Sequence, residues 1–172
     1  MASGLLDRVD CAQLADSEAV LERVYPLSEM PRLQSLLADA RGSVHASFAF
    51  ANVESGRPGA TVIVEAMPQL ICQRCLQGVA FVAHGNSEIE FSSDADAVAT
   101  DPQREVYSTQ NGQVSLRDLA EEELLLALPI VAMHTAQTCA HAPLDEAVNK
   151  IEQMPVERTR PFSALQDLLK KT

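Results

Sequence analysis

A regular alternation of apolar and polar residues after Gly42 most constrains the fold of this chain. Apolar side chains stand at every second position and therefore share one face of an extended strand. These residues are Val44, Ala46, Phe48 and Phe50. Gly and Pro residues at 56–59 supply a turn before the next apolar segment at 61–66. The pattern predicts a β-hairpin that continues as antiparallel strands over about 43–107, arranged as a meander or a partly closed barrel.

A leucine-rich segment follows the predicted strands. Ser115 stands at a capping-box spacing from Asp118, which is typical of a helix N-terminus. Acidic residues in the first turns favour the positive end of the helix dipole, and Pro129 ends the helix. We expect a buried helix over about 116–128.

The N-terminal region 16–41 has apolar residues at helix-like spacing, interrupted by Pro26 and Pro31. The spacing predicts a broken helical region. With the strands and the leucine-rich helix, it gives an α+β fold with N-terminal helical segments. We expect one domain over 1–157, because 172 residues suit a single core, and a separate short C-terminal helix or tail over 158–172.

The net charge of −11 limits the classes of partner. A strongly acidic chain repels a phosphate backbone at long range and favours basic partners, so a general RNA-coating protein is disfavoured. The N-terminus has no signal-peptide pattern, and no apolar segment reaches the about 20 residues of a membrane span. We therefore expect a soluble, cytoplasmic protein, whose cysteines are thiols or metal ligands and not disulfides.

Four residues form a candidate metal site. The candidate ligands are Cys72, Cys75, His134 and Cys139. A Cys-x2-Cys turn directs two thiolates to one point, and a His-x4-Cys pair completes a tetrahedron, so one structural zinc ion is the expected cofactor. The alternative is a turn with two buried thiols and an unrelated surface histidine, because 58 residues separate the two halves. His141 is a substitute ligand if His134 points away.

Other readings of these residues are weaker. A thioredoxin-like dithiol needs a helix N-terminus in a βαβ setting, whereas the segments on either side of the Cys-x2-Cys turn have the pattern of strands. The isolated histidines 45, 84 and 141 and the helix-start glutamates give no catalytic arrangement, and no phosphate-binding glycine loop or nucleophile elbow is present. The sequence therefore predicts a protein that is not an enzyme and takes no small-molecule substrate.

Three groups of residues are candidates for partner binding. Arg74, between the two cysteines, can contact phosphate or a carboxylate, or remain a solvated loop cation. Glu121, Glu122 and Glu123 can form an acidic patch for a basic protein, or only compensate the helix dipole. The tail at 158–172 carries four cations against Asp167, a balance of +3. Its candidate contacts are Arg160, Phe162, Lys170 and Lys171, unless the tail folds back on the domain.

Three sequence blocks together resemble a known family. They are Cys72-Gln-Arg-Cys75, the segment Val114 to His134 with the following Cys139, and Arg160-Pro-Phe-Ser-Ala-Leu with the closing lysines. These blocks are similar to the signature of the YceD-like proteins, the large ribosomal RNA subunit accumulation proteins. The resemblance covers about residues 72–171.

The resemblance implies a ribosome-biogenesis factor for synthesis, processing or stability of 23S ribosomal RNA. Its expected partner is a large ribosomal subunit precursor, through ribosomal protein or 23S rRNA, with no membrane association. Two alternatives remain open: a zinc-stapled protein-interaction module, and an RNA-processing hydrolase. The hydrolase needs clustered carboxylates with a divalent metal, for which the sequence offers only the helix-start glutamates.

Overall fold

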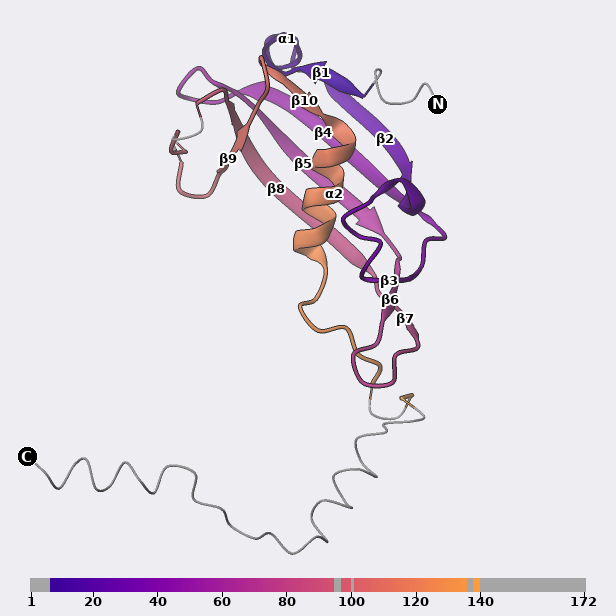
Figure 1. Cartoon of the computed structure of the whole chain (residues 1–172). Coiled ribbons are helices and arrows are strands. Elements are labelled where there is room, and N and C mark those ends of the chain that lie inside the picture. Colours follow the sequence, from indigo (N-terminus) through magenta and orange to yellow (C-terminus); the bar gives the residue numbers. More distant parts are fainter. Residues whose placement is uncertain (1–6, 95–96, 100, 136–137, 140–172) are drawn as a thin grey trace, which may run out of the picture.

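A five-stranded sheet forms the frame of the molecule, with one helix lying across it (Figure 1). The computed structural model describes residues 7–94, 97–99, 101–135 and 138–139. Neighbouring strands are antiparallel except β8 and β9, which are parallel. In sheet order the strands are β2 (Val20–Pro26), β4 (Ser43–Asn52), β5 (Pro58–Ala66), β8 (Ala83–Ser92) and β9 (Glu105–Ser108).

The β4–β5 hairpin confirms the alternation read from the sequence. The two strands pair in unbroken register from Val44 opposite Ala66 to Asn52 opposite Pro58. The inner side chains of β4 are buried and the next ones face outward, as a half-buried strand requires. Phe50 stacks on Phe91 of β8 with ring centroids 6.0 Å apart, which extends the core across the sheet.

Helix α2 (Leu116–Ala127) covers the inner face of this sheet and confirms the predicted leucine-rich helix. Ser115 is the N-cap, and its side chain accepts a hydrogen bond from the Asp118 backbone N–H. The helix buries residues at the spacing of one helical face. They are Leu116, Leu119, Ala120 and Leu124. Each buried leucine contributes about 1.5–3 kcal/mol.

Two small sheets flank the frame. β1 (Arg8–Asp10) pairs with β10 (Gln113–Ser115) beside the short helix α1 (Cys11–Asp16). At the other end, β6 (Gln69–Ile71) lies between β3 (Leu37–Asp39) and β7 (Gly78–Ala80). Figure 1 shows this second sheet beyond the end of α2 from which the chain leaves the helix.

The expected α+β class is wrong, because the described residues are mostly β. They form ten strands in three sheets with two α-helices, and the five-stranded sheet stays open instead of closing as a barrel. The meander is also incomplete: β6 and β7 leave the main sheet, so β5 pairs directly with β8. The hairpin between them therefore projects as a separate element.

The helical region predicted over 16–41 is likewise wrong. The chain there forms β2, the 3₁₀ turn η1 (Leu27–Glu29) and β3. Val20, Leu21 and Val24 match a helical spacing, but pairing of β2 with β4 over seven residues decides the structure. The α1 helix precedes this region, and the loop after η1 buries Met30 and Leu33 against the core.

None of the helices in the described ranges has the length and apolar character that a bilayer crossing requires. The predicted division into a domain at 1–157 and a tail at 158–172 stays a prediction, because residues 140–172 lie outside the described part of the chain.

Candidate metal centre

The connection between β6 and β7 is a tight loop that carries Cys72 and Cys75, here called the knuckle (residues 72–77). The Leu76 N–H donates to the Cys72 carbonyl at 2.9 Å, and the Cys72 N–H donates to the Gln77 carbonyl at 2.9 Å. Leu76 takes a left-handed conformation with φ 60°, which lets the chain reverse within so few residues. Cys72 is buried and Cys75 is half-buried.

The segment after α2 runs alongside the knuckle, and we call it the strap (residues 128–135). The helix ends at its C-cap Leu128, before Pro129. The Gln73 N–H of the knuckle donates to the Ala132 carbonyl of the strap at 2.9 Å. Beyond the strap, the Cys139 N–H donates to the Thr135 carbonyl at 3.1 Å, which holds Cys139 near the end of the strap.

The four predicted ligands meet between knuckle and strap. The thiol sulfurs of Cys72, Cys75 and Cys139 and a ring nitrogen of His134 all lie within 4.8 Å of one another. The Cys75 Sγ is 3.3 Å from His134 Nδ1. A tetrahedral zinc site with Zn–S bonds of about 2.3 Å separates its ligand atoms by about 3.5–4 Å. Small side-chain movements therefore bring all four atoms into ligand positions.

A second contact sets the orientation of the histidine ring. His134 Nε2 lies 3.1 Å from the Gly78 carbonyl oxygen. A carbonyl oxygen only accepts hydrogen bonds, so Nε2 is the donor in this contact and Nδ1 is the ring nitrogen that faces the Cys75 sulfur. Metal-binding histidines commonly have such a carbonyl partner on the other nitrogen. Sequence reasoning could not find this partner, because it is a main-chain atom.

The pKa values of the cluster thiols differ with their surroundings. Burial opposes ionisation of Cys72, but hydrogen bonds from the backbone N–H groups of Cys75 and His134 to its sulfur lower its pKa to about 5. Burial, together with the neighbouring Cys75 and Cys72 sulfurs, raises the pKa of the Cys139 thiol. Several thiolates facing one another repel unless a cation lies between them. The donor set therefore fits a divalent metal ion.

Ligand type and number narrow the kind of metal. Three thiolates and one imidazole form a Cys₃His set, which suits zinc in a closed structural site. All four corners come from protein side chains, whereas a catalytic zinc keeps one position for water or substrate.

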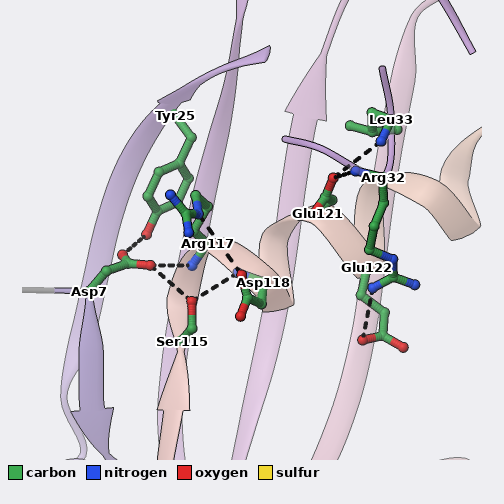
Figure 2. A network of polar contacts seen from close by, with 9 residues as sticks. All are labelled: Asp7, Tyr25, Arg32, Leu33, Ser115, Arg117, Asp118, Glu121 and Glu122. Carbon is green, nitrogen blue, oxygen red and sulfur yellow. Dashed lines mark hydrogen bonds and ion pairs between the residues drawn. The ribbon is translucent and has the colours of Figure 1, made fainter. Parts of the chain in front are cut away.

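Two of the three predicted acidic residues on α2 are buried. Glu121 and Glu123 are buried, and Glu122 is half-buried. Glu121 Oε1 accepts hydrogen bonds from the backbone N–H groups of Arg32 and Leu33 at 2.6 and 3.2 Å (Figure 2). Glu121 thus holds the loop after η1 against α2.

Glu123 turns toward the sheet, where the Ser87 hydroxyl of β8 donates to its Oε2. Gly85 makes this approach possible, since a Cβ there would lie 2.6 Å from Glu123 Oε1. Glu122 reaches the surface and forms an ion pair with Arg32 at 3.7 Å.

Arg74 lies in the knuckle and is half-buried. The tail candidates and the substitute ligand fall outside the described residues. They are Arg160, Phe162, Lys170, Lys171 and His141.

Asp7 is a structural residue that sequence reasoning missed (Figure 2). Its Oδ1 accepts from the Tyr25 hydroxyl at 2.5 Å, and its Oδ2 accepts from the Arg117 N–H at 2.7 Å and from the Ser115 hydroxyl at 3.2 Å. Asp7 therefore caps α2 together with Ser115 and ties β2 to the start of the helix. No local pattern indicates a contact across 110 residues.

Comparisons with known proteins cover the part of the chain that carries this candidate centre. A family model described as "Large ribosomal RNA subunit accumulation protein YceD" matches residues 60–169. A protein of that name from Haemophilus influenzae is 27% identical over 106 residues, which cover 59% of this chain and 60% of the relative. The match thus spans less than two thirds of that relative's length. No solved structure matches significantly.

Proposed function

Because the chain belongs to the YceD family, we propose that it supports synthesis, processing or stability of the 23S ribosomal RNA by binding and not by catalysis. Its proposed partner is a large ribosomal subunit precursor, contacted through ribosomal protein or 23S rRNA, and its proposed location is the cytoplasm. The family description, which names large ribosomal RNA subunit accumulation, supports the biological role. A closed donor set supports a structural use of the cluster.

One observation carries the molecular part of the proposal: four ligand atoms from two distant segments lie within 4.8 Å. We propose that Cys72, Cys75, His134 and Cys139 hold one structural zinc ion. Bound there, zinc supplies a cross-link between knuckle and strap. The protein's own residues prepare this link, because the Gly78 carbonyl orients His134 and the Gln73–Ala132 hydrogen bond aligns the two segments.

The cross-link fixes a surface next to the cluster. Arg74 is a half-buried cation of the knuckle. Leu76 in the knuckle and Ile130 and Val131 in the strap are exposed, with relative accessibilities of 72%, 103% and 52%. Exposed apolar residues that cluster beside a cation are typical of a protein-binding surface. On α2, Glu122 is the acidic candidate whose side chain reaches the surface. The tail residues Arg160, Phe162, Lys170 and Lys171 extend the proposed contact.

The test is sedimentation of the tagged full-length chain with ribosomal particles from cells. We expect the wild type to cosediment with large-subunit precursors, and Cys75→Ser to lose both zinc and most of this association. Cys11→Ala is the matched control, because it removes a buried thiol outside the cluster and should leave both unchanged. Absence of the wild type from precursor fractions would contradict the proposed function, as would cleavage of precursor RNA by the purified chain.

A further inference from the structure

Strand β2 ends the five-stranded sheet with a free edge. It pairs with β4 over seven residues, and within the described residues no strand pairs along its other side. In an antiparallel sheet, alternate N–H and C=O groups of an edge strand point outward without partners. The opposite edge strand, β9, has only four residues. The longer free edge is therefore the better place for a further strand.

The sheet face beside this edge is hollowed on the side away from α2. A depression of about 300 Å³ lies over β2, β4 and β5. Its walls include Glu22, Val24, Ile63 and Glu65, and Ser47 lies among them. Val24 and Ile63 leave 59% and 37% of their surface exposed. The depression therefore offers apolar walls with a carboxylate on either side.

The charge of the depression favours a basic occupant. Glu22 and Glu65 are exposed, and neither forms an ion pair within the described residues. Arg23, the cation of this strand, folds back so that its Nη1 donates to the Glu22 carbonyl at 2.8 Å. The whole chain carries a net charge of −11, which adds long-range attraction for cations and repels nucleic acid.

A second copy of the chain fits this edge poorly. Residues opposite each other in antiparallel strands share a face. The two-fold arrangement that pairs all seven residues of β2 with its own copy places Arg23 opposite Arg23. Like charges in this position destabilise the pair.

We propose that an extended, basic segment of a partner polypeptide adds to β2 as a sixth strand and places a lysine or arginine in the depression between Glu22 and Glu65. Main-chain hydrogen bonds supply the attachment, and the carboxylates select the charge. A long cationic side chain passes over Ser47 with its methylenes against Val24 and Ile63. The inference rests on the proposed function, for which it names the chemistry of the protein partner.

The test uses a fluorescein-labelled peptide of five Lys-Val repeats and the full-length chain, with binding followed by fluorescence anisotropy. We expect Glu22→Lys with Glu65→Lys to weaken binding about tenfold or more. The charge-matched control is Glu54→Lys with Glu105→Lys, two exposed carboxylates away from the depression, and it should weaken binding less than about threefold. A version of this peptide that is N-methylated at alternate amides should show no binding above the background anisotropy.

In the binding experiment, three results would overturn the proposal: equal loss in both double variants, unchanged binding of the N-methylated peptide, or tighter binding of a single-stranded RNA that the Glu22 and Glu65 changes affect in the same way. Thermal unfolding of each variant confirms that it is folded. Sedimentation separates the two proposals. If the Glu22 and Glu65 variant still associates fully with precursors, this inference fails and the proposed function stands, whereas a wild type that does not associate removes the proposed function itself.

Discussion

His134 shows how one residue links the two halves of the candidate centre. Its ring is held from one side by the Gly78 carbonyl and faces Cys75 on the other. Its backbone N–H points to the Cys72 sulfur at 3.5 Å. The residue therefore orients one ligand atom and helps to stabilise a neighbouring thiolate. These contacts hold the strap against the knuckle and bring the two halves of the candidate donor set together.

Cys11 gives a prediction about alkaline stability. Burial, and next the charge of Asp10, raise the pKa of its thiol from 9.0 to about 12. The folded state therefore keeps the thiol neutral while the unfolded state ionises from about pH 9, so the free energy of unfolding should fall as pH rises from 9 to 12. Cys11→Ala should reduce this fall.

Urea unfolding of both proteins from pH 8 to pH 11 measures the effect. Parallel pH profiles for wild type and Cys11→Ala would show that Cys11 is not the group responsible. Tyr25 contributes in the same direction, since burial and its hydrogen bond to Asp7 raise the pKa of the phenol. Tyr25 is present in both proteins, so its contribution does not affect the comparison.

At the scale of elements, α2 is positioned by groups far apart in the sequence. Asp7 and Ser115 satisfy its first N–H groups, while Glu121 and Glu123 attach its middle to the loop after η1 and to β8. The strap leaves from the end of this helix. The position of α2 therefore decides where His134 and Cys139 lie.

Removing the Asp7 carboxylate should weaken this attachment. Asp7→Ala leaves the Arg117 N–H and the Tyr25 hydroxyl without their acceptor, so we expect the free energy of unfolding to fall by about 1–3 kcal/mol. Asp118→Ala is the control. Its side chain is 55% exposed in a long contact with Arg117, so its effect should be within about 0.5 kcal/mol. Equal effects in chemical denaturation would refute the capping role of Asp7.

The elements that sequence predicted are those whose local pattern and tertiary setting agree. The alternation of apolar and polar residues is enough to predict β4. The N-cap serine, the leucines and the following proline are enough to predict α2. The helical prediction for residues 16–41 was wrong because their apolar spacing fits a helix, whereas the strand there forms through long-range pairing with β4. The parallel pairing of β9 with β8 has no local signal either.

The candidate centre was predictable in its residues but not in its geometry. Cysteine and histidine spacing picked out the four side chains that the structure brings together. Their meeting depends on β6 and β7 leaving the main sheet and on the strap lying beside the knuckle. The two buried glutamates could not be separated from Glu122 by sequence, because their partners lie on other elements. Their contribution to binding a partner stays a prediction.

For the whole molecule, the main core is built without the centre. The fully buried side chains of the core come from outside the knuckle and strap, and Leu128 and Ala132 of the strap are partly buried against it. Removal of zinc should therefore loosen one end of the molecule while the sheet stays folded. Hydrogen exchange with and without a chelator tests this.

We expect faster exchange in β6, β7 and residues 128–139 after chelation, and unchanged protection in β4, β5 and β8. Uniform loss of protection across the chain would mean that the centre stabilises the whole fold, and no change anywhere would mean that it carries no metal.

X-ray absorption at the zinc edge on the purified full-length chain tests the central claim most directly. The account predicts about one zinc per chain, with three sulfur neighbours at about 2.3 Å and one nitrogen at about 2.0–2.1 Å. The nitrogen shell should be replaced in His134→Ala, and a sulfur should be lost in Cys139→Ser. Purified protein without zinc, or zinc surrounded only by oxygen and nitrogen, would contradict it.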